Sequence, residues 1–187
     1  MMRKLSWAVQ GFVPRKLLDL ARDDRGMSAV EFAMLLPLML TLYLGGVELS
    51  QGISIDRKVT MTARTVADLV AQAQSVSTAT TADANTALGA SAAILAPYPL
   101  ASAKIVVSVV DIDKNGNAKV RWSSGKNTAA RAAGSTVTIP SAFIVPETSL
   151  VWGEASYEYQ PSIGYVVTGA MTLSDQIFMR PRLDNAT

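Results

Sequence analysis

A single acidic residue, Glu31, stands at the beginning of a long apolar stretch. From Phe32 to Val47 the sequence carries no charged residue. A carboxylate beside hydrocarbon is costly, so its presence there indicates a function and a cationic partner. At the start of a helix, a free α-amino group one turn earlier would be such a partner, because residues four apart share one helix face. A cut in the chain just before Glu31 would create that amine.

The apolar stretch is long enough to cross a membrane. It runs from Met27 to about Ile55 when Glu31 and Glu48 are taken as boundary residues, and a spanning helix needs about 20 mostly apolar residues. Pro37 lies inside the stretch. We expect a local kink there, which membrane helices tolerate.

Basic residues predict the orientation of this helix. Cytoplasmic flanks of membrane helices carry an excess of Lys and Arg. Only Arg57 and Lys58 follow the stretch closely, whereas six basic residues precede it: Arg3, Lys4, Arg15, Lys16, Arg22 and Arg25. The N-terminus is therefore expected in the cytoplasm and the remainder of the chain outside. The run is longer than a secretory signal, so an anchor is favoured over a removed signal peptide.

The segment DDRGMSAVEFAMLLPLMLTL resembles a type IV prepilin cleavage site, with Gly26 last in the leader and Glu31 fifth in the mature chain. It is similar to the start of the TadE/TadG-like minor pilins, or pseudopilins, of the tight-adherence (Flp) pilus system. The later segments ASYEYQPSIG and IFMRPR also resemble that family. The resemblance implies cleavage between Gly26 and Met27, with Glu31 pairing with the new N-terminus during assembly.

The same resemblance implies a domain plan and a set of partners. Residues 1–26 would be a cytoplasmic leader, 27–55 a transmembrane helix, and 56–187 a periplasmic head with a helix extension at 56–75. The partners would be a prepilin peptidase, other pilins and pseudopilins, the pilus assembly platform and the inner membrane. Incorporation into an extracellular pilus would follow.

Residue patterns after the apolar stretch predict an α+β fold with two helices and a small antiparallel sheet. The first helix is expected to continue to about Gln74, since small apolar residues recur at helical spacing (Val59, Ala63, Val66, Val70 and Ala73). A second helix should begin at Thr81 or Asp83 and end near Leu95, before Pro97 and Pro99. Strands are expected at residues 104–112, 118–123, 135–139, 149–159 and 171–179, and a mobile loop at 124–134.

One turn between two predicted strands resembles half of a calcium loop. Asp111, Asp113 and Asn115 are spaced like its first ligands, but a carboxylate is needed at the twelfth position, which is Trp122. Asn115-Gly116 is also a strong hairpin signal. A hairpin turn is therefore favoured over a weak calcium site, and no other metal or cofactor is expected.

Composition argues against catalysis. The 187 residues contain no Cys and no His, which removes thiolate and imidazole chemistry. Ser123 and Lys126 fit the S-x-x-K pattern but lack its supporting motifs. We interpret Glu147, Glu154 and Glu158 as solvated charges on strands. A net charge of +2 with dispersed basic residues does not indicate nucleic-acid binding.

Two other readings stay open at this point. One is an uncleaved bitopic inner-membrane protein whose periplasmic domain binds a ligand or an envelope component. The other is a periplasmic enzyme on a signal anchor, against which the missing His and Cys count. Cleavage after Gly26 distinguishes the pilin from the first of these.

Overall fold

The computed structural model describes residues 25–72, 81–161 and 169–182. The predicted leader therefore lies outside the described residues, apart from its last two. The chain divides into two compact units, Met1–Leu44 and Gly45–Thr187. Helix α2, Arg25–Ala71, contributes to both units, and all other elements belong to the second unit, which we call the head.

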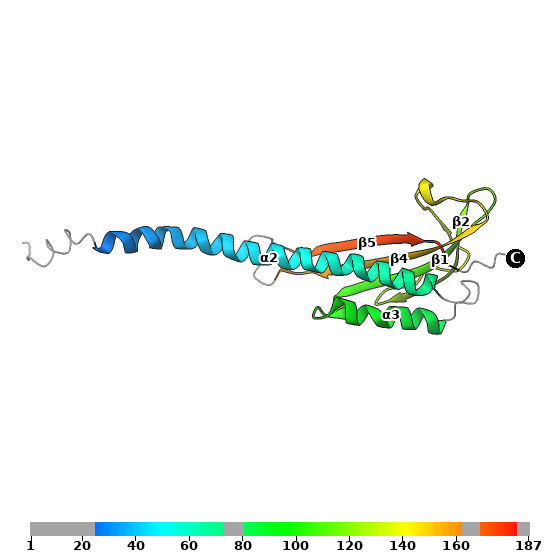
Figure 1. Ribbon diagram of the computed structural model, residues 1–187, viewed down its shortest axis with the longest axis horizontal. Helices are drawn as coiled ribbons and strands as arrows, with labels where there is room; N and C mark the ends of the chain where they lie inside the picture. Colours follow the sequence, from blue (N-terminus) through cyan, green and yellow to red (C-terminus); the bar gives the residue numbers. More distant parts are fainter. Residues whose placement is uncertain (1–24, 73–80, 162–168, 183–187) are drawn as a thin grey trace, which may run out of the picture. The chain divides into compact units, whose positions relative to one another are not determined.

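The head combines two helices with a five-stranded sheet (Figure 1). After α2 come α3 (Thr81–Leu95), the short 3-10 helix η1 (Leu100–Ser102), and strands β1 (Ala103–Ile112) and β2 (Ala118–Lys126). They are followed by β3 (Thr136–Val137), η2 (Ser141–Phe143), β4 (Thr148–Tyr159) and β5 (Met171–Met179). The strand order is β3-β2-β1-β4-β5, with every neighbouring pair antiparallel. The α+β fold expected from the sequence is confirmed.

The helices cover one face of the sheet and form the main core. On α2 the predicted apolar stripe is buried from Val59 through Val70, and Ile55 extends it toward the N-terminus; Ala73 lies outside the described residues. These side chains pack with α3 and with alternate residues of β1 and β4, because successive strand residues point to opposite faces. The stripe is therefore a packing surface of the head.

A glycine allows α2 to lie directly on β4. A Cβ on Gly153 would stand 2.6 Å from the carbonyl oxygen of Ala63 and 2.8 Å from the Cβ of Ala67. Contacts that short do not occur between real atoms, so no other residue fits at this position without moving the helix. The side chain of Lys58 holds the second helix, because its Nζ donates to the carbonyl oxygens of Ile94 and Ala96, 2.9 and 2.7 Å away, at the end of α3.

The opposite face of the sheet has its own smaller core. Val110, Ile112, Leu150 and Trp152 are buried there, and the Phe178 ring stacks on Trp152 with 5.1 Å between ring centroids. The segment that contains η2 contributes Phe143, whose ring lies 5.0 Å from that of Phe178. We call this surface the outer face.

A β-bulge in the first hairpin reverses the side of one tryptophan. Val109 pairs with Trp122, but the next residue of β1, Val110, pairs with Val120. The extra residue, Arg121, shifts the alternation, because a bulge places two residues opposite one. Trp122 consequently packs against the helix-side core, whereas strict alternation would place it on the outer face with Ala118.

Several predicted boundaries were wrong by a few residues. Helix α2 ends at Ala71, earlier than the predicted end near residue 74. Strand β2 continues to Lys126, so the predicted loop at 124–134 is too long; its first three residues pair with β1. The third strand is reduced to Thr136–Val137. Pairing with a longer neighbour explains the β2 extension, since ladder hydrogen bonds override the weak preference of Ser and Gly for strands.

Candidate functional site: the exposed N-terminal helix

Nothing in the described part of the chain packs around the first part of α2. Every residue from Gly26 to Leu40 is exposed, including Phe32 at 58%, Met34 at 76% and Leu38 at 58%. Within the described residues, α2 is the helix long and apolar enough to cross a membrane. It is therefore the candidate membrane anchor of the chain. Exposed apolar surface of this extent indicates contact with lipid or with other apolar helices.

The residues predicted to take part in processing lie in the first turns of this helix. Gly26 and Met27 are both exposed, at the start of the described chain, and nothing lies within 4 Å of a Cβ built on Gly26. Glu31 follows Met27 by one helical turn and is exposed too. The helix geometry thus places the Glu31 carboxylate on the face of Met27. Their roles in cleavage and charge pairing stay predictions.

Pro37 lies inside the continuous helix α2. It lacks an amide hydrogen, so the carbonyl of Ala33 loses its usual helical donor. One turn later, the Thr41 Oγ1 donates to the carbonyl oxygen of Pro37 at 2.8 Å. Such back-bonding, like proline itself, often bends a helix. These features support the predicted kink, which stays a prediction.

The buried side of α2 begins earlier in the chain than the sequence predicted. Glu48 is 3% exposed and Ile55 is 1% exposed, and the Tyr159 hydroxyl donates to the main-chain oxygen of Glu48 at 3.4 Å. Burial, and then the nearby charge of Glu48, raises the pKa of Tyr159 above its usual value near 10. One side of α2 is therefore buried in the head from Glu48 onward, although the sequence predicted a membrane helix as far as residue 55.

The spacing of residues in the sequence could have predicted this early start of the buried side. Glu48, Ile55 and Thr62 are seven residues apart, and all three are buried. Spacing of seven keeps residues on one helix face. The stripe that begins at Val59 could have been extended back to Glu48, but a charged residue next to an apolar run was interpreted as its boundary.

In the calcium-like turn, the Asp113 carboxylate accepts hydrogen bonds from residues of the turn itself. Asp113 Oδ1 accepts from the main-chain N–H groups of Asn115 and Asn117, each at 2.8 Å, and Oδ2 accepts from the Asn117 side chain at 2.9 Å. These bonds lower the pKa of Asp113 below its usual value, the largest cause being the Asn117 side chain. Gly116 has a φ of +82°, as the last residue of a three-residue hairpin requires.

Asp111 points to different partners. It forms an ion pair with Arg121 at 2.6 Å, and it accepts a hydrogen bond from the Ser149 hydroxyl at 2.9 Å. Among the described residues there is no group of three or more metal-binding side chains. The residues of the predicted half-loop thus act in the hairpin and the sheet.

The residues of the S-x-x-K pattern and the three strand glutamates do not form a catalytic arrangement among the described residues. Ser123 Oγ lies 2.9 Å from Ser108 Oγ and 3.1 Å from the Val107 carbonyl oxygen, whereas Lys126 is exposed. Glu158 and Glu147 are exposed, as predicted. The prediction for Glu154 was wrong, because its side chain is 26% exposed and forms an ion pair with Arg131.

The comparisons with known proteins agree with the N-terminal resemblance. Residues 26–68 match the family model described as TadE: TadE-like protein. Searches of curated proteins and of solved structures found no match. The matched segment contains Gly26, Glu31 and the whole exposed helix, and it continues into the stripe that packs in the head. The similarity to TadE-like proteins over residues 26–68 associates the chain with the tight-adherence pilus system and its components.

Proposed function

We propose that the protein is a minor pilin, or pseudopilin, of a tight-adherence pilus, processed by a prepilin peptidase between Gly26 and Met27. The observation that carries this is the exposed apolar helix that starts at Gly26, within a segment that matches the TadE-like family. In this function the helix inserts into the inner membrane with its N-terminus in the cytoplasm. The head stands in the periplasm and carries no catalysis.

The membrane segment in this proposal is shorter than the predicted 27–55. Residues 27–44 belong to the first unit and are mostly exposed, whereas Glu48 and Ile55 are buried in the head. Eighteen residues at about 1.5 Å per residue make about 27 Å of helix, close to the roughly 30 Å of a bilayer core. A span ending near Leu44 keeps the Glu48 carboxylate out of hydrocarbon.

Glu31 has an electrostatic role in the proposal. Cleavage places an ammonium group on Met27, and the Glu31 carboxylate lies one helical turn away on the same face. In an assembled bundle the two charges neutralise each other, in one chain or between neighbours, because uncompensated charges among apolar helices are costly. Glu31 thus favours a chain that has been cut over one that has not.

The test is the N-terminus of the protein purified from its native membrane, measured by intact mass and N-terminal sequencing. We expect a chain that begins at Met27. Gly26→Arg should block cleavage and leave the chain at full length. Gly89→Arg is the matched control, since Gly89 is exposed on α3 with nothing within 4 Å of an added Cβ. It should be processed normally.

An uncut chain in cells with active peptidase would contradict the pilin proposal. It would favour the bitopic protein with a ligand-binding head instead. Glu31→Gln separates the two proposed steps: we expect it to be cut at the normal position but to be lost from sheared pilus fractions. Normal recovery of this variant in those fractions would remove the assembly role of Glu31.

A further inference from the structure

The outer face of the sheet carries a polar groove that the assembly function does not use. Its volume is about 700 Å³, within the range of small-molecule sites. The floor consists of two rows of side chains across three strands: Lys104, Ser156 and Ser174 in one row, and Val106, Glu154 and Gln176 in the next. Two strand spacings of about 4.8 Å make each row about 10 Å long.

One wall of this groove is fixed in place. The segment from Asn127 to Arg131 folds back over the sheet, and the Asn127 amide donates to the carbonyl oxygens of Leu100 and Ala103 at 2.7 and 2.8 Å. Gly125 permits this return, because a Cβ there would lie 2.5 Å from the Thr128 carbonyl oxygen. The wall is thus held by specific contacts, which favours a site formed before a ligand binds.

Arg131 fastens the same wall to the floor. Its guanidinium group binds both carboxylate oxygens of Glu154, with 2.8 Å between Nη2 and Oε1, and donates to Ser108 Oγ at 3.2 Å. It also lies 3.9 Å from the centre of the Trp152 ring. Both members of the ion pair are about one-quarter exposed. Their charges therefore cancel within the groove, and neither is available to bind a charged ligand strongly.

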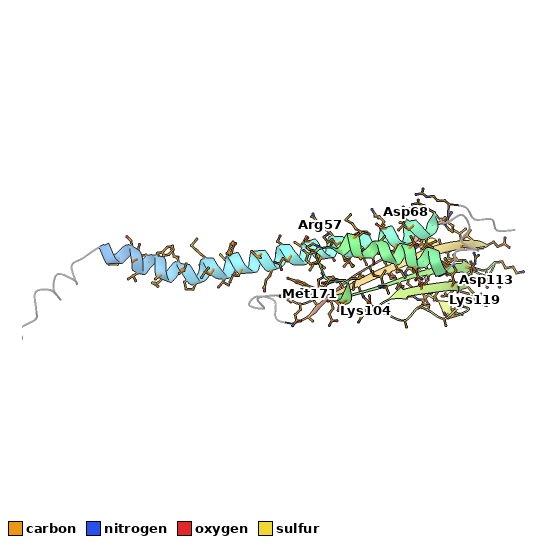
Figure 2. The ribbon with its side chains drawn as sticks, turned by 90° about the horizontal axis from the view of Figure 1, so that it is seen from below. Arg57, Asp68, Lys104, Asp113, Lys119 and Met171 are labelled. Atoms are coloured by element: carbon orange, nitrogen blue, oxygen red, sulfur yellow. The ribbon has the colours of Figure 1, made fainter. Side chains whose placement is uncertain are left out.

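The remaining floor offers neutral hydrogen-bonding groups. Ser174 and Gln176 are exposed, and their side chains have no hydrogen-bond partner in the described part of the chain. Asp175, between them, also lines the groove. It pairs with Ala155 on the helix side of the sheet, so the alternation directs its side chain away from the floor. Lys104 at one end of the groove is exposed (Figure 2) and adds three donors. Donors and acceptors thus outnumber uncompensated charges.

We infer that this groove binds a neutral oligosaccharide of two or three sugar units. Such a ligand presents closely spaced hydroxyls that both donate and accept, as Ser174, Gln176 and Thr128 do. Two linked hexose rings are about as long as the rows of the floor. Val106 and Ala129 supply the small apolar contacts that the C–H faces of a sugar need. A phosphate or carboxylate ligand would find one free cation, Lys104, among the described lining residues.

The test is saturation-transfer NMR on the full chain in a detergent without a sugar headgroup, since maltoside detergents would compete. The probes are the neutral trisaccharides cellotriose, N,N′,N″-triacetylchitotriose and maltotriose. We expect at least one to bind with millimolar or tighter affinity. Ser174→Val and Gln176→Leu should each weaken that binding about fivefold to tenfold, the effect of one lost hydrogen bond or two.

Thr172→Val is the matched control. Thr172 lies on the same strand and the same face as Ser174, two residues away, and it is exposed but does not line the groove. This variant should bind like the original protein. Circular dichroism melting confirms that each variant folds. Absence of transfer to all three probes, or binding that neither groove variant weakens, would overturn the inference. Preferential binding of triglycine or of a sulfated trisaccharide would overturn it as well.

Discussion

The two parts of helix α2 belong to one continuous helix but have opposite environments. From Gly26 to Leu40 every side chain is exposed, whereas Ile55, Val59, Ala63 and Val66 are each 1% exposed or less. Apart from Glu31 near its start, the first part is apolar all round, and the second is apolar on one stripe with charges such as Arg57 and Arg64 on the outside. A helix that is apolar on all sides needs lipid or other helices around it, but a striped helix can be satisfied by one sheet.

The spacing and the size of the side chains explain why only the second part of α2 is buried. In the second part, buried residues recur every three or four positions, and small side chains such as Ala63 and Ala67 bring the helix close to Gly153. In the first part, large side chains such as Phe32, Met34 and Leu42 point outward in all directions. The second part is thus covered by the sheet and by α3, whereas no other described residue covers the first part.

The largest expected effect comes from placing one carboxylate in each part. Val66→Asp puts a charge where the side chain is fully buried, and we expect it to destabilise the head by about 4 kcal/mol or more. Leu36→Asp should leave the melting of the head unchanged. It should instead weaken membrane insertion, by about 3 kcal/mol for a charge at the centre of a spanning helix.

Circular dichroism melting in detergent and flotation with liposomes measure the two properties separately. Equal effects of both variants on melting would mean that the first part also supports the head. A Leu36→Asp chain that floats normally would contradict the membrane role.

Replacing a glycine by alanine in α2 or in the strand beneath it should change the free energy of unfolding by a smaller amount. Gly153→Ala places a Cβ 2.6 Å from the Ala63 carbonyl oxygen, so α2 must move away from β4, at a cost of about 2–3 kcal/mol in the free energy of unfolding. Gly46→Ala meets nothing within 4 Å and should stabilise the helix by up to about 1 kcal/mol. Denaturant titration of both variants gives the comparison. A destabilised Gly46→Ala variant would show that something packs on that side of the helix.

Much of this fold could be predicted from the sequence because its patterns are local. The stripe from Val59 to Val70, the end of α3 before Pro97, and the hairpin at Asn115-Gly116 each depend on neighbouring residues. The sheet order could not be predicted, because it depends on which strands pair across the whole head. Nor could the side on which Trp122 packs, because a bulge at Arg121 changes the alternation. A bulge depends on how two strands meet, which neither strand specifies alone.

The candidate sites divide in the same way. Gly26 and Glu31 were predicted from adjacent residues of one segment. The ion pair between Arg131 and Glu154 joins residues 23 positions apart, and it requires the wall segment to fold back over the sheet. The burial of Glu48 was not predicted for a related reason: its main-chain oxygen meets Tyr159, 111 positions later in the chain and at the end of β4.

A third prediction concerns Tyr159, which anchors the second part of α2 at its first turns. Its pKa is raised in the folded head, so the unfolded chain loses the hydroxyl proton first as pH rises. The stabilisation is therefore complete below pH 10 and is lost as pH rises through the higher folded value. Tyr159→Phe should remove this part of the alkaline destabilisation and cost about 1 kcal/mol at neutral pH.

Melting temperatures measured from pH 7 to 11 give the difference between this variant and the original chain. Tyr43→Phe is the control in the first part, where the ring is 68% exposed, and it should follow the original protein at every pH. If Tyr159→Phe kept the full alkaline loss, the buried Tyr159 hydroxyl would not be its cause.

The smallest expected effect is at the far hairpin, where Asp113 and Lys119 lie near the end of the sheet opposite Met171 (Figure 2). The folded pKa of Asp113 is lowered, so its contribution is present above the unfolded value near 3.8 and is lost as pH falls through the folded one. Asp113→Asn should flatten this acid dependence slightly, whereas Asp56→Asn, on the exposed side of α2, removes a charge without affecting the hairpin. Millimolar calcium should leave the melting temperature unchanged, since both Asp113 oxygens already accept hydrogen bonds from the turn. A calcium-dependent rise that Asp113→Asn abolishes would restore the metal site and make the hairpin, like the first part of α2, dependent on something outside the chain.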